Sequence, residues 1–149
     1  SEMCIRDRFQ TPEMLVKDLK FIEKVSPEMC GIGPFVPHKD TKFKNENHGD
    51  VSLVLMLLSI IRLLKPNILL PATTALGTVD PLGREKGILH GANVVMPNLS
   101  PVKHRKDYSL YDNKICTGDE AAQCIGCLAD RMKKIGYEIV TDRGNYTEK

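Results

Sequence analysis

Residues 67–99 read NILLPATTALGTVDPLGREKGILHGANVVMPNL, and the alternation within this stretch decides the fold. The apolar runs NILLPATTA (67–75) and NVVMPNL (93–99) are rich in strand-forming residues and predict two strands. Between them lie the loop GTVDPLG and a predicted helix over about 84–90, which Gly91 ends. A strand, a helix and a second strand in this order predict a parallel pair joined by a helical crossover.

The same order of elements occurs on either side of this stretch. Upstream, MCGIGPF (29–35) is followed by a polar loop and by a predicted helix over 50–64, with Asp50 as its N-cap. Downstream, NVVMPNL is followed by a long loop and by a predicted helix over about 120–135, after which YEIVTD (137–142) is a candidate for a last short strand. Three units of this kind predict an α/β fold with a parallel sheet.

The first predicted helix has no strand before it. TPEMLVKDLKFIEKV (11–25) begins with Thr11 as a cap and with Pro12 at the first helical position, which is a standard helix onset. Three parallel strands make neither a closed barrel nor a complete doubly wound sheet, and they leave unpaired edges. We therefore expect further elements upstream of this chain.

The chain divides into three parts. SEMCIRDR (1–8) shows no hydrophobic period, cap or turn chemistry, so we interpret it as a non-native segment derived from sequence assembly or an adapter, and Cys4 is set aside as a ligand. Residues 9–115 carry the strand and helix units. Residues 116–149 carry a cysteine-rich segment and the C-terminal helix.

Composition excludes several classes of partner. The 149 residues are 42% hydrophobic and 27% charged, which is ordinary for a globular domain, and the net charge of +2 gives no electrostatic footprint for nucleic acid or an anionic membrane. The apolar run at 51–64 is interrupted by Ser59 and Arg62 and is shorter than the roughly 20 residues that span a bilayer. Five clustered cysteines without a secretory signal favour a reducing, cytoplasmic location.

Cys116, Cys124 and Cys127 stand in the spacing C-x7-C-x2-C and form a candidate metal site. Thiolates are the usual ligands of iron–sulfur clusters, and a C-x2-C arm brings two sulfurs to one metal. A closed zinc site would need a fourth Cys or His nearby, and no His follows His104, so an iron–sulfur cluster is favoured. The alternative is that Cys124 and Cys127 are small buried residues at the start of an amphipathic helix.

Two adjacent threonines follow the second predicted strand. The hydroxyls and backbone N–H groups of Thr73 and Thr74 suit a carboxylate or a similar anion. The alternative is that these threonines cap the turn into the next segment. Arg84 and Glu85 open a helix, where a glutamate suits the helix dipole, and this explanation suffices for both.

Five stretches, taken in order, resemble one known family: GPFVPHKDT (33–41), PATTALGT (71–78), GREKG (83–87), GANVVMPN (91–98) and YSLYDNKIC (108–116). From about Gln10 to the end, the chain resembles the C-terminal half of the HydE maturases of [FeFe]-hydrogenase, radical S-adenosylmethionine enzymes of the biotin-synthase-like group. Biotin synthase and methylornithine synthase share the barrel, but PHKDT and PATTALGT are more similar to HydE. The resemblance implies an α/β fold that is the C-terminal part of a (β/α)8 TIM barrel, with about three βα units and a C-terminal helix.

The resemblance also implies a chemistry. In the family, a [4Fe–4S] cluster held by a C-x3-C-x2-C loop in the N-terminal half cleaves S-adenosylmethionine to a 5′-deoxyadenosyl radical. This motif is absent from the chain, so the fragment alone is expected to be inactive. Cys116, Cys124 and Cys127 match an accessory [2Fe–2S] or [4Fe–4S] site that some family members carry.

Other residues match positions around the family's substrate cavity. Thr73 and Thr74 match a pair that contacts substrate carboxylate groups. Met96, Tyr108 and Met29 match positions near S-adenosylmethionine, although from composition alone Met96 and Met29 are core residues by default. The resemblance implies a cysteine-bound iron carbonyl cyanide substrate that a partner maturase makes, with thiazolidines as alternatives, and it leaves the electron donor open.

Two other functions stay open from the sequence. One is a non-catalytic iron–sulfur, metal-binding or electron-transfer module, in which the cysteine site is the functional part. The other is a related radical enzyme of the biotin synthase or methylornithine synthase type. A hydrolase or isomerase is disfavoured because the chain has no nucleophile elbow, phosphate-binding glycine loop or paired His and carboxylate motif.

Overall fold

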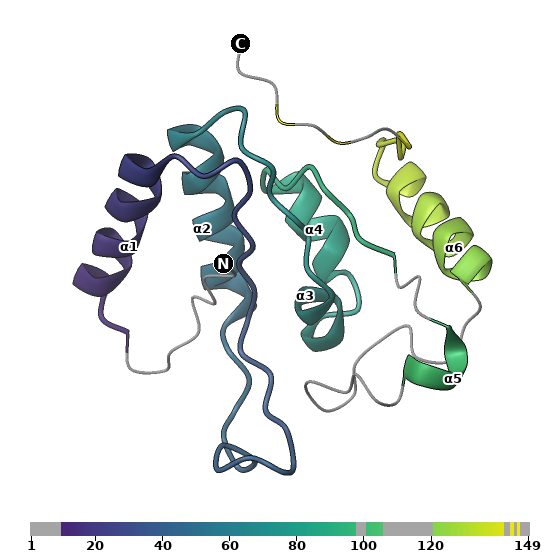
Figure 1. Cartoon of the computed structure of the whole chain (residues 1–149), viewed down its shortest axis with the longest axis horizontal. Coiled ribbons are helices and arrows are strands. Elements are labelled where there is room, and N and C mark those ends of the chain that lie inside the picture. The colour runs from purple at the N-terminus through teal and green to yellow at the C-terminus, as the bar shows by residue number, and fades with distance from the viewer. Residues whose placement is uncertain (1–9, 98–100, 106–120, 142–143, 145, 147–149) are drawn as a thin grey trace.

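The computed structural model describes residues 10–97, 101–105, 121–141, 144 and 146, and this part of the chain contains six helices and three extended segments joined by loops (Figure 1). The helices are α1 (Pro12–Val25), α2 (Val51–Leu64), α3 (Thr74–Val79), α4 (Gly83–Leu89), α5 (Val102–Arg105) and α6 (Ala121–Lys134). In Figure 1, α1, α2, α4 and α6 follow one another across the molecule. The division at residue 8 stays a prediction, because residues 1–9 lie outside the described part.

The three extended segments cover residues 29–33, 68–73 and 92–97. Isolated parallel bridges join Met29 to Leu69 and Pro71 to Val94, which confirms the predicted parallel direction and places the second segment between the other two. Among the described residues, however, these contacts stay single bridges and do not extend into the continuous strands that we expected. Pro71 has no N–H group to donate and glycines weaken the first segment, so a longer ladder is disfavoured.

The predicted helix boundaries rest on side-chain caps and glycines. Thr11 accepts a hydrogen bond from the backbone N–H of Met14, and the Asp50 carboxylate accepts one from Ser52 at 2.8 Å. Gly91 follows α4 with φ of 104°, a conformation that favours glycine. These caps confirm the predicted starts of α1 and α2 and the predicted end of α4.

Two predicted elements are wrong in the described part. We expected the second strand to continue to residue 75, but Thr73 caps a helix and α3 begins at Thr74. A local cap therefore competes successfully with the strand pattern. The predicted strand at 137–142 is also absent over 137–141, where Val140 is 80% exposed and none of the described segments supplies ladder hydrogen bonds.

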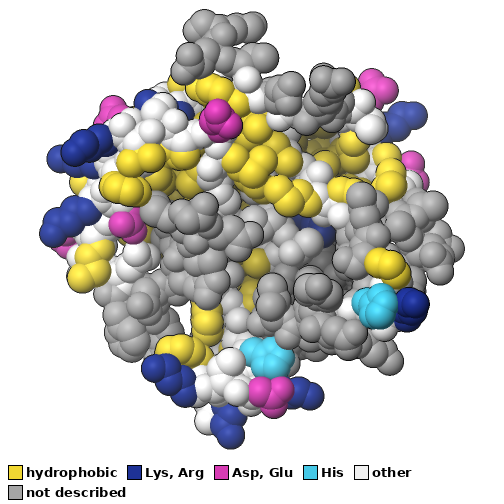
Figure 2. Space-filling view, in the orientation of Figure 1, with side chains coloured by type: hydrophobic (Ala, Val, Ile, Leu, Met, Phe, Trp, Pro, Cys, Tyr) yellow, Lys and Arg dark blue, Asp and Glu magenta, His cyan; other side chains and the backbone are white. Residues whose placement is uncertain are grey.

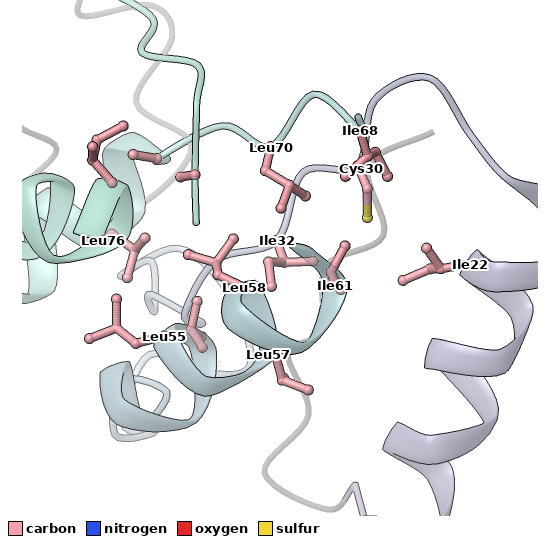
Figure 3. Packing of buried hydrophobic residues seen from close by; sticks show 14 of the residues in the cluster. Ile22, Cys30, Ile32, Leu55, Leu57, Leu58, Ile61, Ile68, Leu70 and Leu76 are labelled. Atoms are coloured by element: carbon pink, nitrogen blue, oxygen red, sulfur yellow. The ribbon is translucent and has the colours of Figure 1, made fainter. Parts of the chain in front are cut away.

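The core lies between α2 and the extended segments. Val54, Leu57, Leu58 and Ile61 recur at helical spacing and are all buried. They pack with Ile22 of α1 and with Ile32, Ile68 and Leu70 of the extended segments (Figure 3). Burying each such side chain contributes about 1.5–3 kcal/mol.

None of the described helices is both long enough and apolar enough to span a membrane.

Helix α4 packs directly on α3 through two glycines. A Cβ atom at Gly83 would stand 2.2 Å from the carbonyl oxygen of Leu76 in α3, and one at Gly87 would stand 3.4 Å from the Cδ1 of the same leucine. No side chain fits between the backbones at Gly83. This close approach fixes where the remaining side chains of α4 point.

Candidate functional site

The extended segments have two faces, and three of the predicted site residues lie on the face turned away from the core. Successive side chains of an extended segment alternate between faces, and bridged residues point to the same side. Because Cys30, Ile32 and Leu70 belong to the core, the bridged pairs belong to the opposite face. We call this set the non-core face: Met29, Gly31, Gly33, Leu69, Pro71, Thr73, Val94 and Met96.

Part of the non-core face is apolar and open. Met29 is 45% exposed and Met96 is 48% exposed. A Cβ atom at Gly31 would meet nothing within 4 Å. Figure 2 shows that hydrophobic side chains gather in the upper part of the view, whereas most Lys and Arg side chains lie around the outline of the molecule. Such a surface suits the lining of a cavity that other protein segments complete.

Thr73 lies where the second segment ends, next to the first segment. Its hydroxyl oxygen accepts a 3.5 Å hydrogen bond from the N–H of Leu76, so the capping role that we set against ligand binding is confirmed. A Cβ at Gly33 would lie 2.7 Å from the same oxygen. Capping uses only an acceptor position of the hydroxyl, so the O–H group can still donate to an anion.

Thr74 is the first residue of α3 and is half-buried. Its carbonyl oxygen accepts a 3.0 Å hydrogen bond from the hydroxyl of Thr78. The two predicted substrate-binding threonines are therefore held at one point, where an extended segment turns into a helix. Polar groups after the carboxyl end of a parallel strand are the usual position for ligand contacts in α/β folds.

Met29 and Met96, which we expected near S-adenosylmethionine, lie at different positions along the extended segments. Met96 follows Val94 by two residues and so shares a face with Thr73. Met29 lies beside Leu69, four residues before Thr73, which is about 13 Å along an extended chain. The structure therefore separates Met29 from the threonines along the segments, and Tyr108 lies outside the described residues.

Two of the predicted metal ligands are one turn apart on α6. Positions 124 and 127 are three residues apart in α6, so the two backbone positions lie on the same side of the helix. The thiol of Cys127 is free and exposed, whereas burial raises the pKa of the Cys30 thiol in the core. Cys116 lies outside the described residues, and the described part brings no three potential metal ligands together. The three-cysteine site therefore stays a prediction.

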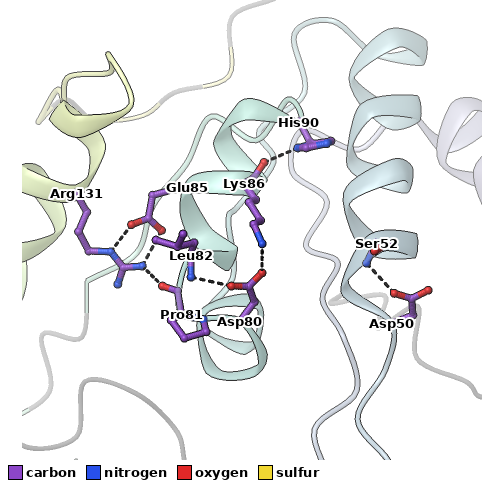
Figure 4. Close-up of polar contacts among 9 residues, drawn as sticks. All are labelled: Asp50, Ser52, Asp80, Pro81, Leu82, Glu85, Lys86, His90 and Arg131. Atoms are coloured by element: carbon purple, nitrogen blue, oxygen red, sulfur yellow. Dashed lines mark hydrogen bonds and ion pairs between the residues drawn. The ribbon is translucent and has the colours of Figure 1, made fainter.

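An ion pair that we did not predict fixes α6 against α4. The Nε of Arg131 lies 2.5 Å from Oε1 of Glu85 and its Nη2 lies 2.6 Å from Oε2, while Nη2 also donates to the carbonyl of Pro81 (Figure 4). The Glu85 side chain is 9% exposed. The favourable position of Glu85 in the helix dipole therefore does not fully explain this residue. Its ion pair with Arg131 also holds the cysteine-bearing helix α6 against α4.

The sequence analysis did not predict that the side chain of Arg84 is buried. It is 2% exposed, and its Nε and Nη2 have no hydrogen-bond partner in the part of the chain that the structure describes. The available signal was the spacing of GREKG, since glycines on both sides of Arg84 in one helix indicate close backbone packing. Such packing buries the residue between them.

The ion pair predicts a pH dependence of stability. Burial raises the pKa of Glu85, but the hydrogen bond and charge of Arg131 outweigh burial, and the net pKa is lowered. Because a lowered carboxyl pKa stabilises the folded state above the unfolded value, this contribution is present near neutral pH and is lost as the pH falls through the folded pKa. Glu85→Gln should therefore lower the unfolding midpoint at pH 7 and lower it much less near pH 3.

Denaturant unfolding of both proteins between pH 7 and pH 3 measures this difference. Glu23→Gln, at an exposed position of α1, is the control and should give two nearly parallel curves. A Glu85→Gln difference that does not change with pH would contradict the assignment.

Comparison with known proteins gives two relatives, and no family model matches the chain. The chain is 43% identical over 135 residues to the [FeFe] hydrogenase maturase subunit HydE of Thermotoga maritima, which covers 91% of the chain and 39% of that protein. It is 25% identical over 144 residues to the 3-methylornithine synthase of Methanosarcina acetivorans, again covering 91% of the chain and 39% of the relative. The chain thus spans about two fifths of the length of each.

Proposed function

We propose, from the premise that this chain resembles the C-terminal part of HydE, that it is part of a cytoplasmic radical S-adenosylmethionine enzyme of [FeFe]-hydrogenase maturation. The observation that carries the proposal is the 43% identity over 91% of the chain. The similarity to a 3-methylornithine synthase supports the same broad class of enzyme. Both relatives imply an α/β fold of the TIM-barrel type.

In this proposal the non-core face lines the reaction cavity. Its apolar residues exclude water from the reacting groups, which protects a radical and strengthens polar contacts within the cavity. Thr73 and Thr74 bind and orient a substrate carboxylate through their hydroxyls. Met96 and Met29 supply soft apolar surface beside the cofactor, and Tyr108 supplies a flat ring.

S-adenosylmethionine, when it is bound beside a reduced [4Fe–4S] cluster, supplies the 5′-deoxyadenosyl radical. The cysteines of this chain do not suit that cluster, because the sequence contains no C-x3-C-x2-C. The ligands would therefore come from a part of the protein outside this chain. The proposed substrate is the cysteine-bound iron carbonyl cyanide species, received from another maturase.

A peripheral iron–sulfur cluster is the second part of the proposal. Cys124 and Cys127 fit two ligand positions because they are one helical turn apart and Cys127 is exposed. Cys116 would be the third ligand. The Glu85–Arg131 ion pair would hold this cluster-bearing helix against the rest of the fold.

The direct test is cleavage of S-adenosylmethionine by the full-length gene product after anaerobic reconstitution with iron and sulfide. We expect 5′-deoxyadenosine on reduction, and none from residues 9–149 treated in the same way. If the full-length product binds iron but forms no 5′-deoxyadenosine, the enzyme proposal fails and the metal-binding or electron-transfer module replaces it.

Loss of the threonine hydroxyls should weaken substrate binding. Thr74→Val removes one hydroxyl and leaves the α3 cap intact, so we expect the KM or Kd for a carboxylate-bearing substrate to rise roughly 10-fold, and about 100-fold when Thr73→Val is added. The double variant also loses about 1 kcal/mol of stability with the cap. Substrate titration followed by formation of 5′-deoxyadenosine gives both values.

Thr78→Val is the matched control, since its hydroxyl bonds back to the carbonyl of Thr74 within α3. It should leave the KM within about twofold of the starting protein. An unchanged KM in the double variant would contradict the assignment of Thr73 and Thr74 and would favour the electron-transfer alternative.

A further inference from the structure

The guanidinium of Arg84 is a buried charge whose partner remains to be assigned. The residue is 2% exposed, and Nε and Nη2 have no hydrogen-bond partner in the described part of the chain. The adjacent carboxylate of Glu85 is already engaged, because both of its oxygens accept from Arg131. The charges of Arg84 and Glu85 interact, but Nε and Nη2 of Arg84 donate no hydrogen bond to this carboxylate, so their hydrogen-bonding partner must come from elsewhere.

The register of α4 places Arg84 toward the interior. Gly83 and Gly87 face α3 and the second extended segment, while Glu85 faces α6. Arg84 lies between these directions, one turn before Ile88 on the same side of the helix. Ile88 is 7% exposed and belongs to the hydrophobic core, so the guanidinium is directed into protein and away from bulk water.

The unpaired atoms have a specific chemistry. Nε and Nη2 form one edge of the planar guanidinium, and their two parallel N–H groups match the two oxygens of a carboxylate. A buried cation that lacks a partner is strongly destabilising, whereas a bidentate carboxylate compensates both the charge and the hydrogen bonds. Carbonyl groups provide a weaker match, as at Arg62, whose Nε donates to the carbonyl of Gly91.

We propose that Arg84 binds a carboxylate group through Nε and Nη2. The carboxylate belongs either to an acidic side chain of the full-length protein or to a bound small molecule, and the chemistry of recognition is the same. The proposal rests on a different side chain from the assignment of Thr73 and Thr74, and on burial instead of resemblance. It does not depend on radical chemistry, so it can fail while the proposed function stands.

The order of stability among variants tests the proposal. Thermal unfolding of the full-length gene product is measured for the Arg84, Arg84→Lys and Arg84→Met proteins, in sodium acetate and in sodium chloride of equal ionic strength. With a side-chain carboxylate as partner, Tm should fall in the order Arg, Lys, Met, with at least about 5 °C between the first and last, and acetate should have no effect. If the Arg84→Lys variant is expressed in soluble form and the Arg84→Met variant is not, this result also supports the order Arg, Lys, Met.

With a small-molecule carboxylate as partner, acetate should raise the Tm of the Arg84 protein by at least about 2 °C and leave that of Arg84→Met unchanged. Arg62→Met is the matched control, because Nε and Nη1 of Arg62 donate to carbonyl groups and only its Nη2 lacks a partner in the described part of the chain; its loss should lower the Tm without altering the response to acetate. The proposal is overturned if Arg84→Met is the most stable of the three proteins and acetate changes none of them, since a truly unpaired charge is removed with a gain in stability.

Discussion

Replacing Cys124 and Cys127 together by serine should remove the peripheral cluster completely. Serine keeps the size of the side chain but provides no soft thiolate, and the one remaining cysteine cannot hold a cluster by itself. In the anaerobically reconstituted full-length gene product, we expect iron to fall by about two to four atoms per chain, with a matching loss of the charge-transfer absorbance. Formation of 5′-deoxyadenosine should continue, because the radical chemistry is assigned to ligands outside this chain.

Cys30→Ala is the matched control for this experiment. Cys30 is 6% exposed in the core, and burial raises the pKa of its thiol, so it is not available as a thiolate ligand. Its replacement should leave the iron content unchanged. Equal iron in the double serine variant and the starting protein would refute the cysteine site, and the structural alternative for these two cysteines would then be correct.

Gly83→Ala should cause the largest loss of stability of any single methyl addition in the described part of the chain. The new Cβ would lie 2.2 Å from the backbone oxygen of Leu76, and a rotamer change cannot move a carbonyl group that lies inside α3. Helices α3 and α4 must then separate, which we expect to cost at least about 3 kcal/mol. Denaturant unfolding measures the change.

Gly126→Ala, in helix α6, should have the opposite effect on stability. A Cβ at Gly126 would meet nothing within 4 Å, so the substitution should stabilise the protein by about 0.5–1 kcal/mol through helix propensity alone. If Gly83→Ala is as well tolerated as Gly126→Ala, then α4 does not pack on α3 as the structure has it.

Local chemistry explains what the sequence predicted correctly. Thr11 and Asp50 cap their helices and Gly91 adopts a positive φ, and each of these signals depends on a few neighbouring residues. The parallel direction of the three extended segments follows from the alternation of apolar runs and helices, and the bridges confirm it.

The errors arose where two local signals competed or where the partner was distant in sequence. At Thr73, the residue pattern of a strand overlaps with that of a helix N-cap. The hydroxyl of Thr73 accepts a hydrogen bond from the N–H of Leu76, and this bond favours the helix. Glu85 and Arg131 are 46 residues apart, so no local pattern links them. The partner of Arg84 is equally invisible in the sequence, and only burial shows that one is needed.

The nucleotide sequence upstream of the codon for Gln10, read from an unbroken genomic clone, tests the central claim most directly. The account predicts that the reading frame continues upstream through a half-barrel of alternating strands and helices that contains C-x3-C-x2-C. It also predicts that the codons for SEMCIRDR are absent from the genome at that position. A frame that begins at SEMCIRDR, with no such motif upstream, would contradict the claim that this chain is part of a radical S-adenosylmethionine enzyme.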